Sequence, residues 1–238
     1  MRNASAVEKR TCVTYHLPGM LTLGVDTSES LGGVALYEEG RLAETRTMDT
    51  PLSHAERLFP LIEAILAACE VDKSQLNLVS INRGPGSFTG LRIGLAAMKG
   101  LCQSLDIPLI GVDGTQVYRQ LVEDHQRVCV VLASRRDLFY VRWFGGSRPK
   151  GPTVVMREAE LIARLGQEER ELCLVGSGVS RLGEHLRPWQ HMRIAPEALN
   201  QPSPLAVAQW GRENYVADQL YSVEPLYVEP LLVGGNAA

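Results

Sequence analysis

A short glycine-rich segment carries the residue types in this chain that are best suited to bind a ligand or a phosphate. Residues 84–90 read Gly-Pro-Gly-Ser-Phe-Thr-Gly and lie between two apolar runs, residues 76–81 and residues 93–105. This order predicts a turn from a strand into a helix, with glycine free to take positive φ on both sides of the proline. We call this segment the elbow; its key residues are Gly84, Pro85, Gly86, Ser87, Thr89 and Gly90.

The elbow could bind phosphate, because backbone N–H groups at a helix N-terminus attract anions. A P-loop, however, closes with Gly-Lys-Ser/Thr, whereas Leu91 follows Gly90 here. A dinucleotide fingerprint and a serine-nucleophile elbow each need a glycine where Thr89 stands. We therefore favour a stiff turn that starts a packing helix near Gly90, capped by Ser87 or Thr89, with a phosphate cradle as the alternative.

Composition describes an ordinary globular protein. The chain has 238 residues, 45% of them apolar and 21% charged, with a formal net charge of -3 and no run of 18 apolar residues. This balance predicts neither a nucleic-acid surface nor a membrane surface, so any contact with RNA would need a partner. The five cysteines are widely spaced without a Cys-x-x-Cys pair, which is typical of buried thiols in a reducing, cytoplasmic compartment.

Strand and helix patterns repeat along the chain. In the first half we predict strands at 21–26, 33–37, 41–48, 76–81 and 108–112, and helices at 53–69, 90–105 and 115–123. In the second half we predict strands at 128–133, 139–144, 153–156 and 172–175. We predict helices at 158–165, after Gly178 as far as Leu186, and at 205–216. Both halves begin βββαβα, the ground plan of the actin-like, sugar kinase and Hsp70 ATPase (ASKHA) fold, with a reduced or irregular second lobe.

The same patterns suggest a division of the chain. We expect residues 20–114 to form an N-terminal lobe that carries the partner-binding helices. Residues 115–238 then form a C-terminal lobe and tail. Met20 directly precedes the first strand, so residues 1–19 are expected to be a flexible leader or to lie upstream of the true start.

Five segments resemble one known family. They are residues 23–28 (Leu-Gly-Val-Asp-Thr-Ser), 53–58 (Ser-His-Ala-Glu-Arg-Leu), 84–94, 108–112 (Pro-Leu-Ile-Gly-Val) and 224–227 (Glu-Pro-Leu-Tyr). In this order they are similar to the bacterial TsaB family of tRNA threonylcarbamoyladenosine biosynthesis proteins, also called YeaZ. The resemblance is dense as far as Val112 and thin beyond it. Ala-Ser-Arg-Arg at 133–136 replaces the acidic-Ala-Arg-Arg stretch that the family tends to carry.

The resemblance implies a scaffold without catalytic activity of its own. Such a protein binds and supports its catalytic paralogue TsaD, which transfers threonylcarbamoyl to the adenosine beside the tRNA anticodon. The resemblance also implies a homodimer when the chain is alone, an ATPase subunit TsaE reached through the complex, and only indirect contact with tRNA. It implies no cofactor and no membrane partner.

The metal motif of the catalytic relative is incomplete in this chain. That relative holds its metal with His-x-Glu-x-His on the first helix, and the matching residues here run from His54 to Leu58. A leucine side chain cannot coordinate a metal. We therefore expect no metal site and a structural or interface role for His54, with a relic ligand as the alternative.

Two loops could retain part of a nucleotide site. Asp26, Thr27 and Ser28 follow the first strand, where the broader fold places an Asp near nucleotide-bound metal, although the same residues suit an Asx turn, which we favour. Gly176 and Gly178 are the candidates for the cooperating loop in the second lobe. A small-molecule kinase or ATPase that uses the cleft between the lobes is therefore the alternative function.

The helix predicted at 90–105 has two apolar arcs, and one of them must face something other than its own sheet. Its arc of small residues would let another helix approach closely, beside the broad apolar face of the helix at 53–69. The expected interface residues are Leu58, Leu61, Ile62, Ile65, Ile93, Ala96, Ala97 and Gly100. The alternative is that the two helices pack only on each other and on the sheet.

Overall fold

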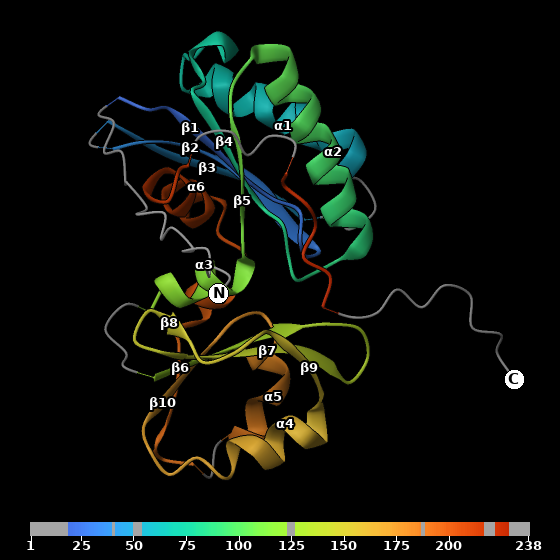
Figure 1. Ribbon diagram of the computed structural model, residues 1–238, viewed down its shortest axis with the longest axis vertical. Coiled ribbons are helices and arrows are strands. Elements are labelled where there is room, and N and C mark those ends of the chain that lie inside the picture. Colours follow the sequence, from blue (N-terminus) through green and yellow to red (C-terminus); the bar gives the residue numbers. More distant parts are fainter. Residues whose placement is uncertain are drawn as a thin grey trace, which may run out of the picture.

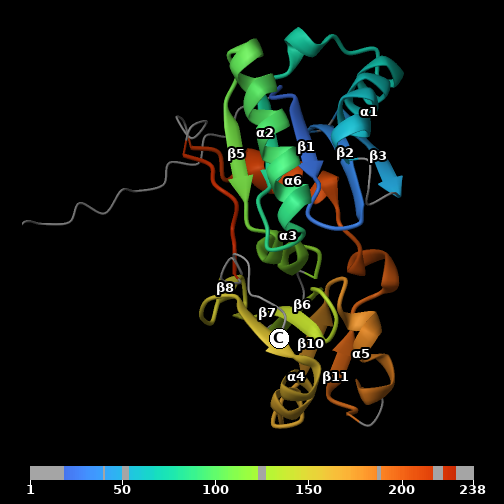
Figure 2. The same ribbon diagram turned by 90° about the vertical axis from the view of Figure 1, so that its right-hand side faces the viewer.

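A computed structural model describes residues 19–39, 41–49, 54–122, 127–186, 189–216 and 222–228. These residues form two α/β lobes, each built around one sheet, with helix α3 (Gly114–Gln120) between them (Figures 1 and 2). The predicted leader lies almost wholly outside the described residues. Within those residues, no helix is both long and apolar enough to cross a bilayer.

The first sheet has five strands in the order β3-β2-β1-β4-β5. They are β1 (Thr22–Asp26), β2 (Leu31–Glu38), β3 (Leu42–Asp49), β4 (Leu78–Asn82) and β5 (Leu109–Val112). The first three strands pair antiparallel, which confirms the predicted meander, and β4 and β5 continue the sheet in parallel. Helices α1 (His54–Ala68) and α2 (Phe88–Leu105) supply the crossovers that parallel neighbours require.

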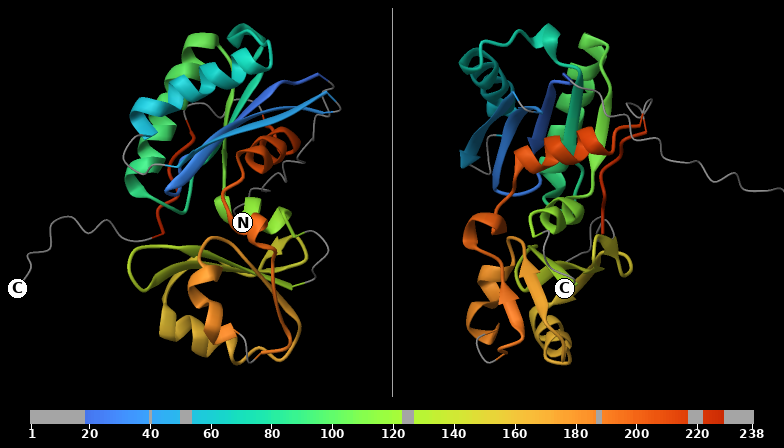
Figure 3. Two further views of the ribbon diagram at one scale, coloured as in Figure 1. Left: turned by 180° about the vertical axis from the view of Figure 1, so that it is seen from behind. Right: turned by 90° about the vertical axis from the view of Figure 1, so that its left-hand side faces the viewer.

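Helices cover both faces of this sheet. Helices α1 and α2 lie side by side on one face, and α6 (Pro204–Glu213) crosses the other (Figures 1 and 3). All five residues of β1 are consequently buried. Leu23 and Val25 join the core beneath α1 and α2, and Gly24 between them lies against α6.

The second sheet has the order β11-β10-β6-β7-β8, and β9 also pairs with β7. Its strands are β6 (Arg127–Ala133), β7 (Leu138–Gly145), β8 (Arg148–Pro149), β9 (Val154–Arg157), β10 (Leu172–Val175) and β11 (Met192–Ile194). Helices α4 (Glu158–Leu165) and α5 (Val179–Leu186) cover one face, and α3 packs against the other (Figure 1). Two short 3-10 helices, η1 (Lys73–Gln75) and η2 (Glu197–Asn200), complete the elements.

Helix α6 returns to the first lobe, although the predicted division grouped it with the second. Ser80 on β4 donates a 2.7 Å hydrogen bond from its hydroxyl to the carbonyl O of Val207 in α6. A Cβ on Gly24 would overlap the backbone of Pro204, and a Cβ on Gly211 would overlap Ser80. Glycine on each side thus lets helix and sheet approach closely, and the residues after the second sheet close the first lobe.

Candidate functional site

The elbow joins β4 to α2. Gly84 has φ of +114°, and its peptide bond to Pro85 is cis. The hydroxyl O of Ser87 accepts a 3.2 Å hydrogen bond from the amide of Gly90, so Ser87 is the helix cap and α2 begins at Phe88. Thr89, the other candidate for the cap, lies inside the first turn.

Gly86 corrects the sequence-based expectation, because it does not have positive φ. Its backbone passes directly against the turn after β1, where an added Cβ would overlap the carbonyl O of Ser28. The next residue, Ser87, donates its amide N–H to the same oxygen at 2.6 Å. Glycine is required here by a close approach between two segments, not by its backbone conformation.

The Asp26 carboxylate organises the turn after β1. Its Oδ1 accepts hydrogen bonds from the Ser28 amide at 2.9 Å and the Ser28 hydroxyl at 2.6 Å, which makes the Asx turn. Its Oδ2 accepts a 2.9 Å hydrogen bond from the Asn82 side-chain amide. The Thr27 hydroxyl donates to the carbonyl O of Gly90, at 2.9 Å. Asp26 therefore joins the turn after β1 to β4, and Thr27 joins the same turn to α2.

In the loop that contains Gly176 and Gly178, the backbone amides donate hydrogen bonds to other parts of the chain. Gly176 has φ of +121°, and its amide donates to the side chain of Asn200 at 2.9 Å. The Gly178 amide donates to the carbonyl O of Val131 at 2.9 Å. Ser177 accepts a 3.1 Å hydrogen bond from the Ala133 amide on its hydroxyl. Neither glycine lines the cavity between the lobes.

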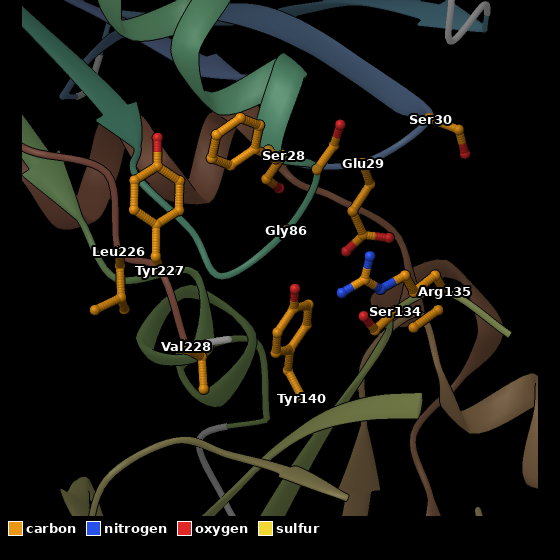
Figure 4. A pocket seen from close by; sticks show the side chains of 13 residues that line it. Ser28, Glu29, Ser30, Gly86, Ser134, Arg135, Tyr140, Leu226, Tyr227 and Val228 are labelled. Atoms are coloured by element: carbon orange, nitrogen blue, oxygen red, sulfur yellow. The ribbon is translucent and has the colours of Figure 1, made fainter. Parts of the chain in front are cut away.

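A cavity of about 570 Å³ lies between the lobes, beside the elbow (Figure 4). It is bounded by the turn after β1, the elbow, the end of β6 with the turn that follows, and the segment at 226–228. Its lining residues are Ser28, Glu29, Ser30, Gly86, Ser87, Phe88, Ala133, Ser134, Arg135, Tyr140, Leu226, Tyr227 and Val228. The repeated pattern in the sequence could have pointed to this site. The turns after β1 and β6 follow the first strand of each repeat, so they occupy equivalent places in the two lobes.

One end of the cavity is aromatic. The rings of Phe88 and Tyr227 lie with their centroids 5.1 Å apart. Arg92 lies 3.8 Å from the Phe88 centroid and donates from Nε to the Tyr227 hydroxyl at 2.9 Å. Tyr140 directs its hydroxyl toward the cavity from the second lobe (Figure 4). Sequence reasoning did not select these aromatic residues as a site.

The other end carries Glu29, which sequence reasoning also missed. Burial raises the pKa of Glu29 from 4.5 to about 7. A hydrogen bond with Ser177 lowers the pKa, the Asp26 carboxylate raises it, and a hydrogen bond with Tyr118 lowers it. The Tyr118 hydroxyl lies 3.0 Å from Glu29 Oε1. Glu29 therefore links the first lobe to α3 and to the second lobe.

The predicted interface residues fall into two groups. Leu58, Ile62 and Ile65 are at most 3% exposed and belong to the core of the first lobe, because α1 packs this face against β2 and β3. They are core residues in this fold, which corrects their expected exposure to a partner. The remaining residues are half-buried, as for Leu61, Ile93 and Ala97, or exposed, as for Ala96 and Gly100.

The residues at the metal-motif positions do not fit a metal. Leu58 is 1% exposed within the core. The side chain of His54 lies outside the described residues. Among the described side chains, no group of three or more His, Cys, Asp or Glu could hold a metal ion.

Solved structures define the class of fold. YeaZ from Pseudomonas aeruginosa superposes with a TM-score of 0.71 at 24% identity, over 87% of this chain and 99% of that one. Inorganic polyphosphate/ATP-glucomannokinase from Arthrobacter sp. strain KM gives a TM-score of 0.51 at 13% identity, over 81% of this chain and 98% of that one. The chain has the two-lobed fold of the actin-like ATPases and sugar kinases, as its duplicated pattern predicts.

Sequence comparisons give a more specific similarity than the fold does. The tRNA threonylcarbamoyladenosine biosynthesis protein TsaB of Bacillus subtilis is 24% identical over 88% of this chain and 94% of its own length. TsaB of Escherichia coli is 34% identical over 39% of this chain, but the match spans only 40% of that relative. The model of the family TsaD, tRNA N6-adenosine threonylcarbamoyltransferase, matches residues 49–159. By these matches the chain is similar to the TsaB/YeaZ proteins, which confirms the resemblance in its motifs.

Proposed function

We propose that this chain is a non-catalytic subunit in the biosynthesis of threonylcarbamoyladenosine in tRNA, where it binds and supports a TsaD-type catalytic subunit. The observation that carries the proposal is the burial of Leu58, at 1% exposure, where the catalytic relative has its second histidine. A side chain inside the apolar core offers neither a ligand atom nor access for a metal. These features support a subunit that keeps the fold without the metal chemistry.

The loops around the cleft also argue against the alternative, a small-molecule kinase or ATPase. Phosphate binding at a helix N-terminus needs free backbone N–H groups. At the elbow, the amide of Ser87 donates to Ser28, and the amides of Gly90 and Leu91 donate to Ser87. In the second lobe, Gly176 and Gly178 donate to Asn200 and Val131. These donors are already satisfied within the protein.

The outward face of α2 is the docking surface that we propose. A Cβ on Gly100 would meet no heavy atom within 4 Å, and Ala96 is exposed beside it. Small side chains let a partner helix approach closely, and the half-buried Ile93 adds an apolar contact at the same face. The same surface would serve a second copy of this chain when the catalytic subunit is absent. TsaE and tRNA are then reached only through the complex.

Binding of a purified TsaD-type subunit tests this proposal. Ile93→Glu places an unpaired charge in the contact, so we expect it to weaken binding at least tenfold, equivalent to about 1.4 kcal/mol or more. Ala159→Glu adds the same charge to an exposed position of α4 in the second lobe and should leave the affinity unchanged. Wild-type affinity in Ile93→Glu would exclude this face of α2. Failure of the wild-type chain to bind the subunit at all would refute the proposed function.

A further inference from the structure

We infer that residues 222–228 act as a strap that ties the first lobe to the second and limits how far the lobes can move apart. These residues follow α6 in the chain and run along the first lobe toward the second, beside β5 and the elbow (Figures 1 and 2). We call this segment the strap. The inference goes beyond the proposed function and does not depend on the docking surface.

One end of the strap is buried in the first lobe. Val223 is 5% exposed and belongs to the core of that lobe. It lies against Gly111 on β5, where an added Cβ would come within 2.6 Å of a methyl carbon of Val223. An added Cβ on Gly84 of the elbow would lie 2.8 Å from the carbonyl O of Leu226. Glycine at both positions therefore lets the strap lie directly against the first lobe.

Hydrogen bonds fix the position of the strap along the first lobe. The amide of Leu226 donates to the carbonyl O of Arg83 at 2.7 Å. One residue further on, the Tyr227 hydroxyl accepts a 2.9 Å hydrogen bond from Nε of Arg92, and the Tyr227 ring lies beside that of Phe88. Backbone and side chain thus hold the same short stretch to the elbow and to α2.

The other end of the strap reaches the second lobe. Val228 is half-buried and packs against the apolar cluster that α3 and the second sheet form, which includes Tyr118, Val130 and Tyr140 (Figure 4). Val228 comes only two residues after Leu226, whose amide is bonded to the first lobe. Two residues of extended chain span at most about 7 Å, so the strap has little slack between its two attachments.

A link of this kind restricts hinge motion. The chain also passes between the lobes where β5 leads into α3 and where η2 leads into α6. Two such connections would still allow the lobes to rotate about a hinge, as two-lobed proteins do when they open and close. The strap adds a third link, and opening would have to withdraw Val228 from its apolar contacts. The closed arrangement is therefore favoured by the chain itself.

Hydrogen exchange of the full chain, followed by NMR, tests whether Val228 anchors the strap. Val228→Ser removes most of the apolar contact, so we expect the Leu226 amide to exchange about tenfold faster. Val216→Ser makes the same change at a valine that is 44% exposed and lies outside the strap, and should leave this rate unchanged. An unchanged rate in Val228→Ser would overturn the inference.

The distance between the lobes gives the second readout. Spin labels can be attached to cysteines introduced at Glu63 of α1 and Ala163 of α4, which are both exposed. Cys12 and the half-buried Cys69 are first replaced by serine, because the other three cysteines are buried. Dilution with unlabelled chain ensures that only distances within one molecule are measured. We expect one narrow distribution of distances in the chain with an intact strap.

Loss of either attachment should widen this distribution. Val228→Ser releases the strap from the second lobe, and Tyr227→Ala loosens it on the first, so both should give longer or more varied distances. Tyr227→Ala carries the test if Val228→Ser does not fold, and Val216→Ser is again the matched control. Distributions as narrow as that of the intact strap in these variants would show that the lobes keep their angle without it, and would overturn the inference. A broad distribution with the strap intact would overturn it as well.

Discussion

The amide N–H of Ser87 donates a 2.6 Å hydrogen bond to the carbonyl O of Ser28, and so joins the elbow before α2 to the turn after β1. Gly86 lies beside this contact, where it leaves room for the same carbonyl group. Both segments line the cavity between the lobes. The contact therefore sets the shape of one cavity wall and the direction in which α2 begins.

A larger residue at Gly86 should destabilise the close contact between the elbow and the turn after β1. Gly86→Ala puts a methyl group against the backbone of Ser28, so we expect it to lower the free energy of unfolding by about 1–3 kcal/mol. Gly100→Ala is the matched control, because its Cβ meets open space inside a helix and should raise stability by about 0.5–1 kcal/mol. Denaturant unfolding measures both. Wild-type stability in Gly86→Ala would show that the two segments can separate without cost.

Leu58 provides the second prediction. It is buried in the core of the first lobe, so Leu58→Ala should lower the free energy of unfolding by about 2–5 kcal/mol. Leu61→Ala, at a half-buried position on the same helix, should cost less. Dialysis of the wild-type chain against a chelator should leave its melting temperature unchanged. Stoichiometric zinc or iron in the purified protein would contradict our interpretation of this position.

Glu29 should make stability depend on pH. Its pKa is raised from 4.5 to about 7, so between these values the folded state binds the proton more tightly than the unfolded state. The contribution of Glu29 is fully present below about pH 4.5 and is lost as the pH rises through about 7. The shift corresponds to at most about 3 kcal/mol. The groups around Glu29 are Asp26, Tyr118, Ser177 and Arg135.

Denaturant unfolding at about pH 5 and about pH 8 measures this dependence, because the two conditions lie on either side of the raised pKa. Compared with Glu29→Gln, the wild-type chain should lose stability at the higher pH. Glu63→Gln should follow the wild-type pH profile, since that side chain is exposed. Parallel pH profiles for the wild type and Glu29→Gln would mean that Glu29 titrates at an ordinary carboxyl pKa.

Much of the fold follows from local sequence patterns. Helix α4 and strand β10 have the predicted bounds, and the meander before α1 was expected from short polar connections between three strand patterns. Ser87 could be selected as one of two helix caps because a hydroxyl before an apolar run is a local signal. The sequence also shows directly that Leu58 stands where the metal motif needs a histidine. These features depend on residues that are close together in the chain.

Only the tertiary structure decided which residues meet across the lobes. Sequence alone could not place Glu29 against Tyr118 and Ser177, or Tyr227 against Phe88. It also misjudged the face of α1 that the core buries, because an apolar stripe looks the same whether the chain's own sheet or a partner covers it. Gly86 shows the same limit, because glycine is needed there to make room for the backbone of Ser28, which is far away in the sequence. The sequence by itself determined the two repeated lobes and the missing metal ligand, whereas long-range packing made the cavity.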